Sequence, residues 1–150
     1  MSFPLAPDAV VAIQAPAPVT LAAGEAAQAR ISVVVADGYH VQANPASDEF
    51  LVPLRIELRA GGGVRPGQPV YPPGRPYRLA GASSDLMTYG GTFEIEVPLR
   101  AAESARPGHH VLRGVLRYQA CDTRTCLFPA SLPVMLPVRV VAAPAKPVRP

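Results

Sequence analysis

The chain carries two cysteines, Cys121 and Cys126, with four residues between them, and the sequence contains no others. A disulfide between these two residues would close a short loop. In the chain-entropy description the stabilisation by a disulfide grows with loop length and reaches about 3 kcal/mol for a loop of about 15 residues. A bond that contributes so little to stability indicates another role, and reversible thiol–disulfide chemistry is the first candidate.

The residues around the cysteines predict an exposed hairpin. Residues 122–125 are all polar, residues 118–119 end one expected strand, and residues 127–129 lead into the next. We therefore expect the cysteines to face each other at the mouth of a hairpin. An exposed disulfide in a short loop is open to attack by an incoming thiolate, which thiol–disulfide exchange requires.

Other readings of the cysteine pair remain open at this point. The pair could form an inert disulfide of an exported protein, or it could be two free thiols. A metal site is a further alternative, although two cysteines do not complete a tetrahedral zinc shell. His109 and His110 could supply nitrogen ligands, and Met87 or Met135 together with the cysteines would suit copper(I).

The elements that must position the cysteines are strands. Apolar and polar residues alternate with period two in several runs, as in a strand with one wet face. Turn sequences such as Gly61-Gly62-Gly63 and Arg106-Pro107-Gly108 separate the runs, and no stretch of ten or more residues shows helical periodicity. The pattern predicts an all-β chain with strands over residues 30–35, 54–59, 92–100, 110–118 and 134–140.

We expect an immunoglobulin-like β-sandwich. The antibody type is excluded because it needs two cysteines on separate strands around a core tryptophan, and this chain has no tryptophan. Pro133 and Pro137 lack an N–H group and project the same way, so they predict an edge strand near the C-terminus.

Length and composition indicate one globular domain. The chain has 150 residues, of which 49% are hydrophobic and 17% charged. We expect a domain over residues 1–141 and a Pro/Ala-rich tail or linker over 142–150. No run approaches the roughly 20 apolar residues of a membrane-spanning helix. The first residues lack the basic start and apolar run of a signal peptide, so an exported protein would have lost that signal from this chain.

The charge distribution argues against nucleic-acid binding. The net charge is +3 and the sequence pI is near 9.2. The arginines are scattered singly among Ala, Pro and Gly, whereas nucleic-acid binding requires a clustered basic surface.

The cysteine segment also carries a family resemblance. The strings Tyr118-Gln119-Ala120-Cys121 and Cys126-Leu127-Phe128-Pro129 resemble the active-site segment of the N-terminal periplasmic domain family of the thiol:disulfide interchange protein DsbD. The resemblance runs from about Val33 to Val140. Supporting segments are Asp37-Gly38-Tyr39-His40-Val41, Asn44-Pro45-Ala46-Ser47-Asp48, Pro69-Val70-Tyr71-Pro72 and Tyr89-Gly90-Gly91 followed by Phe93-Glu94-Ile95.

The resemblance implies an immunoglobulin-like domain in the bacterial periplasm that needs no cofactor. It implies electrons received from a thioredoxin-like domain, supplied through a membrane-embedded domain that could belong to the same full-length chain. Their destinations would be oxidised clients such as disulfide isomerases and cytochrome c maturation proteins.

The resemblance also assigns roles to residues. It makes Cys121 and Cys126 the redox pair and favours Cys126 as the cysteine that forms the bond to a client. The best-known relatives have one more residue between the cysteines, and an acidic pair and a Phe in the loop that caps them. Here Tyr89 is the candidate covering aromatic. The expected cap is Asp85, Leu86, Met87, Thr88 and Tyr89, and the other expected site residues are Tyr39, His40, Gln119 and Phe128.

Two rival functions remain alongside the redox reading. One is a non-enzymatic binding or chaperone module with an inert disulfide, and the other is a copper-handling domain. A reduction potential below about −300 mV would indicate a structural disulfide, whereas a higher value would suit exchange.

Overall fold

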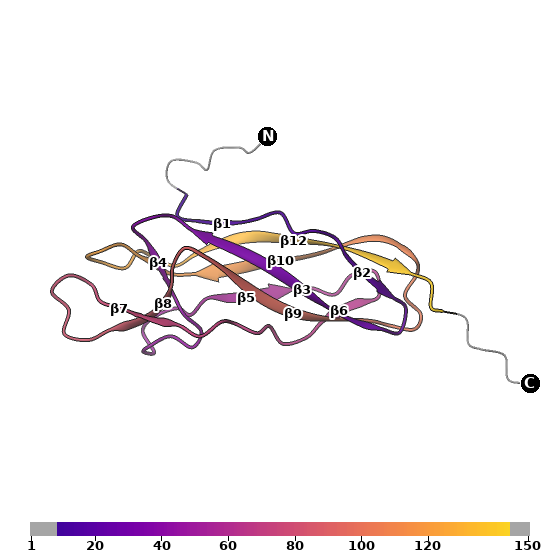
Figure 1. The fold of residues 1–150 in the computed structure, drawn as a ribbon, viewed down its shortest axis with the longest axis horizontal. Coiled ribbons are helices and arrows are strands. Elements are labelled where there is room, and N and C mark those ends of the chain that lie inside the picture. The colour runs from indigo at the N-terminus through magenta and orange to yellow at the C-terminus, as the bar shows by residue number, and fades with distance from the viewer. Residues whose placement is uncertain (1–8, 145–150) are drawn as a thin grey trace, which may run out of the picture.

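The computed structural model describes residues 9–144, and this part of the chain forms twelve strands and no helix. None of the described residues therefore forms a helix that could cross a membrane. The expected tail over residues 142–150 is described only as far as residue 144, and residues 1–8 also lie outside the described part. The described part of the chain is elongated, and its C-terminal end, drawn in yellow, lies at one end of the long axis (Figure 1).

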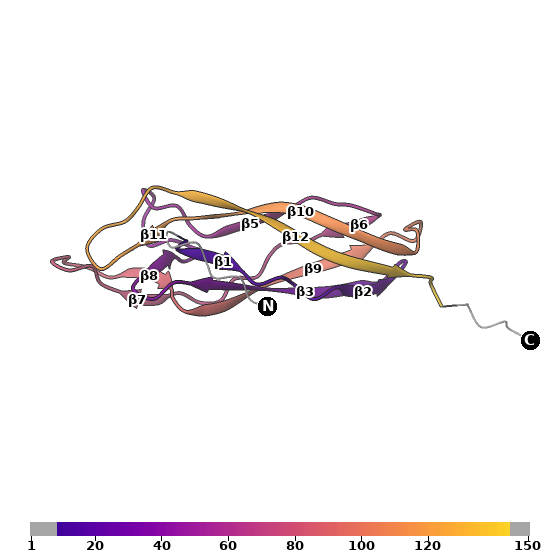
Figure 2. The same ribbon diagram turned by 90° about the horizontal axis from the view of Figure 1, so that it is seen from above.

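Two four-stranded sheets form the body of the domain. One has the order β1 (Val11–Ile13), β3 (Ala26–Val35), β9 (Thr92–Ala101) and β6 (Val64–Pro66). The other has the order β2 (Val19–Ala22), β12 (Ala130–Val141), β10 (Gly108–Tyr118) and β5 (Arg55–Leu58). Figure 2 shows the strands β10 and β12 in one layer and β1 and β3 in the other.

The core lies between these two layers, and period-two alternation builds it. Ile31 lies opposite Ile95 in the first sheet, and Leu112 lies opposite Leu136 in the second; all four side chains are fully buried. Alternate residues of the same strands face solvent, as expected for sheets with one wet face. The expected immunoglobulin-like β-sandwich is confirmed, as are the five strands predicted from alternation.

The prediction of an edge strand at Pro133 and Pro137 needs correction. Strand β12 is an interior strand, because it pairs with β10 on one side and with β2 on the other. The parallel pairing with β2 covers only Val138 to Val141, however. Both prolines precede it, where β12 has a strand partner only on the β10 side. The missing N–H groups therefore fall in the half of the strand that has one neighbour.

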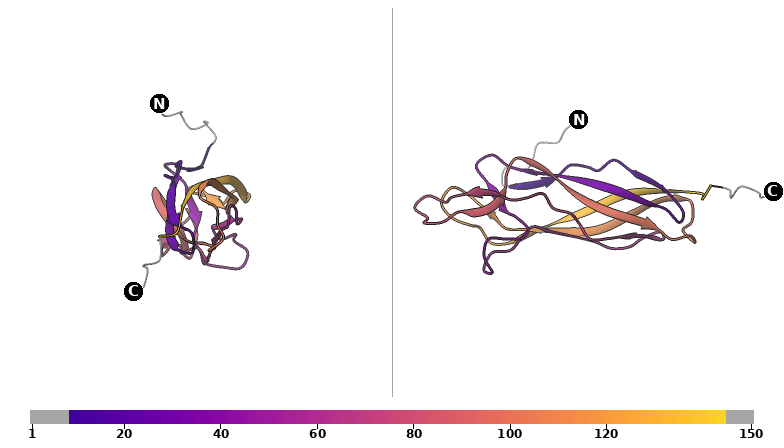
Figure 3. Two further views of the ribbon diagram at one scale, coloured as in Figure 1. Left: turned by 90° about the vertical axis from the view of Figure 1, so that its right-hand side faces the viewer. Right: turned by 60° about the horizontal axis from the view of Figure 1, so that its bottom comes forward.

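A third, smaller sheet positions the cysteines. Its order is β11 (Ala120–Cys121), β4 (His40–Gln42), β8 (Leu86–Tyr89) and β7 (Arg75–Tyr77). It lies at the end of the molecule opposite the end of β12, as the right panel of Figure 3 shows for the loops around β7 and β8. Strand β11 follows β10 after a single residue, so the main sandwich delivers the cysteine segment directly to this sheet.

Candidate functional site

The two cysteines form a disulfide across a tight hairpin. Cys121 and Cys126 pair directly, and their Sγ atoms are bonded. The backbone N–H of Leu127 donates to the oxygen of Ala120 at 2.7 Å, and that of Asp122 donates to the oxygen of Thr125 at 2.9 Å. The expected hairpin is therefore confirmed. Its connection is largely exposed, as expected, but the disulfide is asymmetric: Cys121 is fully buried and Cys126 is partly exposed.

Asp122 fixes the turn between the cysteines. Its Oδ1 atom accepts hydrogen bonds from the backbone N–H groups of Arg124 and Thr125, both at 2.8 Å. These two bonds hold the pKa of the Asp122 carboxyl below its usual range, because they favour the charged form. The carboxylate therefore engages the turn backbone, and the turn keeps its shape without a glycine.

One face of the small sheet gathers polar side chains beside the disulfide. Cys121 lies opposite His40, and Gln42, two residues further along β4, lies opposite Thr88. Since side chains alternate along a strand, all four residues project from the same face. The Nε2 of Gln42 donates to Cys121 Sγ at 3.1 Å and lies 3.8 Å from Cys126 Sγ. Gln42 is fully buried.

Gln42 was not among the residues identified from the sequence. It stands in the string Tyr39-His40-Val41-Gln42, where only the first two residues were singled out. The sequence could have indicated it only through its position two residues after His40, because on a strand these two side chains project from the same face. That signal becomes meaningful only once β4 is known to pair with the cysteine strand.

His40 stacks on Tyr77, which sequence analysis also missed. The ring centroids are 3.8 Å apart and the planes are inclined by 21°. Burial lowers the pKa of His40 below its ordinary value, so the imidazole is neutral near neutral pH. Its buried Nδ1 atom has no hydrogen-bond partner among the described residues. The stack therefore holds a neutral histidine directly beside the buried cysteine.

The β7–β8 hairpin lies over the cysteine hairpin. The hydroxyl of Tyr77 donates to the main-chain oxygen of Asp122 at 3.0 Å, and the backbone N–H of Ala80 donates to the oxygen of Thr123 at 2.8 Å. Arg78 and Asp85 form an ion pair at 2.8 Å across the β7–β8 loop. In Figure 1 the loop of this hairpin and the orange cysteine loop lie beside each other at the left end. The β7–β8 hairpin is thus hydrogen-bonded to the turn that joins the two cysteines.

Large apolar side chains are exposed around the partly exposed cysteine. Phe128, two residues after Cys126, is 94% exposed, and Leu127 is 38% exposed. The Gln119 side chain accepts from the N–H of Val52 at 2.8 Å and donates to the oxygen of Leu127 at 3.1 Å. It therefore ties the loop that carries Phe50, itself 86% exposed, to the cysteine hairpin. We call Phe50, Leu127 and Phe128 the apolar rim.

Residues 6–136 match the family described as "Thiol:disulfide interchange protein DsbD, N-terminal". The chain belongs to this family. The resemblance seen in the cysteine segment is thereby confirmed, and membership of the DsbD N-terminal family together with the Cys121–Cys126 disulfide supports a thiol–disulfide exchange domain. A comparison with curated protein sequences finds no match.

A solved structure shares the fold. It is the N-terminal periplasmic domain of ScsB from Proteus mirabilis, with a TM-score of 0.56 and 16% sequence identity. The match covers 84% of this chain and 44% of that chain, so this chain spans less than half of the ScsB domain. At this identity the likeness supports the fold alone.

Four of the five residues expected to form the family's cap lie on one strand and divide between its two faces. Leu86 to Tyr89 form strand β8 and not a loop. Thr88 and Leu86 share the face of Cys121, whereas Met87 and Tyr89 project into the core. The loop that contacts the cysteine hairpin is the one before β8, and it includes Asp85.

Tyr89, the candidate covering aromatic, lies in the core. Its side chain is 4% exposed and its ring packs on Phe93 at a centroid distance of 4.6 Å. Its hydroxyl donates to the oxygen of Pro72 at 2.8 Å and accepts from the N–H of Asn44 at 3.0 Å. Tyr77 instead holds the position above the cysteine turn. Tyr39 packs partly buried against the core.

The residues considered for copper are not gathered at the cysteines. His109 and His110 begin β10, whereas the cysteine segment follows the end of this eleven-residue strand, roughly 30 Å away at the usual rise per residue. Met87 packs against the core. The Sδ atom of Met135 accepts a hydrogen bond from Nη1 of Arg113 at 3.1 Å. Among residues 9–144 no three His, Cys, Asp or Glu side chains form a cluster that could hold a metal.

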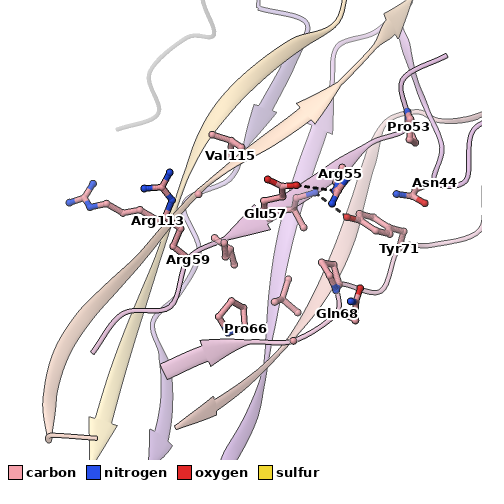
Figure 4. A pocket seen from close by; sticks show the side chains of 16 residues that line it. Asn44, Pro53, Arg55, Glu57, Arg59, Pro66, Gln68, Tyr71, Arg113 and Val115 are labelled. Carbon is pink, nitrogen blue, oxygen red and sulfur yellow. Dashed lines mark hydrogen bonds and ion pairs between the residues drawn. The ribbon is translucent and has the colours of Figure 1, made fainter. Parts of the chain in front are cut away.

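A groove of about 1080 Å³ lies on the side of the sandwich, beside β5 (Figure 4). Arg59, Arg113 and the Arg55–Glu57 ion pair line it, together with Tyr71, whose hydroxyl accepts from the N–H of Ile56 at 3.0 Å. Neither cysteine lines this groove. The disulfide and its surroundings are therefore the candidate site.

Proposed function

We propose that this domain is a periplasmic thiol–disulfide relay, which accepts electrons from a thioredoxin-like domain and passes them to oxidised client proteins. The observation that supports it best is the asymmetry of the disulfide. Cys126 is partly exposed beside an apolar rim, while Cys121 is buried against an amide donor. This arrangement offers one sulfur to a partner and retains the other.

The first step is attack by the partner's thiolate on Cys126 Sγ. A bond forms between the two proteins, the Cys121–Cys126 bond breaks, and its electron pair goes to Cys121 Sγ as a thiolate. The partner's second thiolate then attacks its own bridged sulfur, which releases Cys126 as a thiolate. The partner leaves oxidised by two electrons and this domain is reduced by two.

The second step reverses the roles. The Cys126 thiolate attacks a client disulfide and expels one client thiolate. Cys121 then attacks Cys126 Sγ, reforms the internal disulfide and expels the second client thiolate. Two electrons pass to the client, and the domain needs no cofactor because the sulfurs carry them.

The proposed location and partners are supported by a relative and by the surface of the domain. The ScsB domain with the same fold is described as periplasmic. The periplasm is an oxidising compartment in which a disulfide such as Cys121–Cys126 can form and persist. The apolar rim of Phe50, Leu127 and Phe128 would receive the partner. The β7–β8 loop would move aside when the partner docks, because few hydrogen bonds hold it. A membrane-embedded domain would supply the electron donor.

Trapping of mixed disulfides tests this function. We expect Cys121→Ser, which retains the partly exposed Cys126, to capture a thioredoxin-like donor domain and a model client as mixed disulfides. Cys126→Ser should capture far less, because Cys121 is buried. If neither variant forms a mixed disulfide, the relay is wrong. A reduction potential below about −300 mV would then favour a binding module with an inert disulfide.

A further inference from the structure

We propose that the side-chain amide of Gln42 is a positioning group that holds Cys121 Sγ and stabilises its thiolate when the disulfide opens. This inference rests on the proposed relay for its purpose. Its central statement, that Gln42 makes the Cys121 thiol more acidic, can be tested without a partner.

The backbone of Gln42 is fixed on both sides. Its N–H donates to the oxygen of Gln119 at 2.9 Å, and its own oxygen accepts from the N–H of Leu54 at 3.2 Å. The side chain is fully buried and its Nε2 reaches Cys121 Sγ at 3.1 Å. These backbone hydrogen bonds therefore hold the Gln42 amide beside Cys121 Sγ.

The orientation of the amide is informative. Its Oε1 atom is buried and has no hydrogen-bond partner among the described residues. A buried acceptor without a partner costs about 1–3 kcal/mol. The reversed orientation would place Oε1 against the lone pairs of sulfur and would lose the donor contacts with both sulfur atoms. A glutamine with a purely structural role would be expected to use both ends of its amide, so the contact with sulfur is the feature that explains this residue.

An amide N–H gains most when sulfur becomes charged. A disulfide sulfur is a weak acceptor, whereas a thiolate forms a charge-assisted hydrogen bond that is roughly twice as strong as a neutral one. When a partner's thiolate attacks Cys126, the electron pair of the broken bond moves to Cys121 Sγ, where Nε2 already lies. The amide then favours the leaving thiolate over the intact disulfide. It likewise keeps Cys121 deprotonated for the later attack on Cys126 Sγ.

Other groups near Cys121 have to be considered as sources of the same effect. His40, opposite Cys121 on β4, is a neutral imidazole, and Tyr77 from β7 donates its proton to Asp122. Arg75 on β7 lies opposite Thr88 and is exposed, as is Arg124 in the hairpin turn.

The Asp122 carboxylate, which would oppose a thiolate, is bound to two backbone N–H groups of its own turn. Among the described residues, only Gln42 donates a side-chain hydrogen bond to Cys121 Sγ.

The test measures the pKa of Cys121 alone, in the Cys126→Ser background, from the pH dependence of iodoacetamide alkylation. Gln42→Met keeps the length of the side chain and removes the donor. We expect a pKa about one to two units higher, which is a thiolate fraction about 10- to 100-fold lower near neutral pH. Gln28→Met, the same change at an exposed position on β3, should leave the pKa unchanged. An unchanged pKa in folded Gln42→Met would overturn the proposal.

A second measurement needs no substitution at Gln42. In ¹⁵N-labelled Cys126→Ser protein, the Nε2 resonance of Gln42 should shift with pH and follow the ionisation of Cys121, because the donor senses the thiolate directly. A resonance that does not respond to this ionisation would also overturn the proposal. The readout remains valid if Gln42→Met fails to fold.

The two proposals can fail separately. If Gln42→Met raises the thiol pKa but the wild-type disulfide accepts no electrons from a thioredoxin-like domain, the relay is wrong and the role of Gln42 stands. If the wild type exchanges electrons and Gln42→Met has an unchanged thiol pKa, the relay stands and the role of Gln42 is wrong.

Discussion

The hydroxyl of Tyr77 donates a hydrogen bond to the main-chain oxygen of Asp122 at 3.0 Å, and this bond joins two hairpins that are 45 residues apart in the sequence. On one side is the β7–β8 hairpin and on the other is the turn between the cysteines. A second bond, from Ala80 to Thr123, supports the same contact. These two hydrogen bonds link the β7–β8 loop to the turn between the cysteines, and the proposed relay requires a docking partner to replace them.

Removal of the Tyr77 hydroxyl should expose the disulfide more often. Tyr77→Phe keeps the ring that stacks on His40 and removes the donor to Asp122. A hydrogen bond of this kind contributes about 0.5–1.5 kcal/mol, so opening of the loop should become about 2- to 10-fold more frequent. The measurement is the rate at which a small dithiol reduces the disulfide, and we expect it to rise by a similar factor.

Tyr71→Phe is the matched control for this experiment. The Tyr71 hydroxyl accepts from the N–H of Ile56 in the side groove, away from the cysteines. This variant should lose stability without faster reduction of the disulfide. Equal reduction rates for wild type and Tyr77→Phe would show that the β7–β8 loop does not control access.

His40 should make stability depend on pH. Burial lowers the pKa of His40 in the folded state from the ordinary 6.5, so between these two values the unfolded chain binds more protons than the folded protein. The stabilisation from keeping His40 neutral is thus complete above pH 6.5 and is lost as the pH falls towards the folded-state pKa.

Chemical denaturation from about pH 7.5 to about pH 5 checks this pH dependence. His40→Phe keeps a ring against Tyr77 and cannot titrate, so its free energy of unfolding should fall less over this range than that of the wild type. The exposed His109 gives the control: His109→Phe should keep the wild-type slope. Identical slopes for wild type and His40→Phe would contradict the prediction.

We expect Phe128 to contribute to partner binding and not to the stability of the fold. Its side chain is 94% exposed, so Phe128→Ala should change the free energy of unfolding by no more than about 0.5 kcal/mol. Exposed aromatic residues at interfaces commonly contribute more than about 1 kcal/mol to binding. We therefore expect kcat/KM for reduction by a thioredoxin-like domain to fall about 5- to 10-fold, with reduction by a small dithiol unchanged.

Val70→Ala is a suitable comparison for Phe128→Ala. Val70 is 56% exposed and forms a bridge with Glu96 of β9. Truncation there removes exposed apolar surface without touching the apolar rim, so partner kinetics should match the wild type. An equal loss of kcat/KM in both variants would argue against docking at the rim.

We expect a glycine to be required at position 114, where strand β10, which leads to the cysteine segment, pairs with β5. It lies opposite Leu58 where β10 meets β5, and a methyl group there would overlap the carbonyl oxygen of Glu57. The strands would have to separate, so Gly114→Ala should lower the free energy of unfolding by about 3 kcal/mol or more. Gly91, with φ of +65° and open space around it, gives the contrast: Gly91→Ala should cost only about 1–2 kcal/mol. Thermal and denaturant unfolding of both variants measures the difference.

The sequence by itself determined five of the twelve strands of the described residues, and the cysteine hairpin. Alternation such as that of residues 54–59 depends only on which side chains must leave water, so it fixes where strands lie without knowledge of their neighbours. The cysteine hairpin was equally local, because only four residues lie between the pair and they form a polar turn. The sequence strings around Cys121 and Cys126 were enough to predict the family.

The tertiary structure alone decided what surrounds the disulfide. Gln42 is 79 residues from Cys121, and only the pairing of β4 with β11 brings its amide to the sulfur. The covering aromatic illustrates the same limit: Tyr89 was the aromatic that the sequence suggested, but the register of β8 turns it into the core, whereas Tyr77 reaches the cysteine turn. Which face of a strand is buried depends on distant partners, because a shift of one residue in register exchanges the two faces.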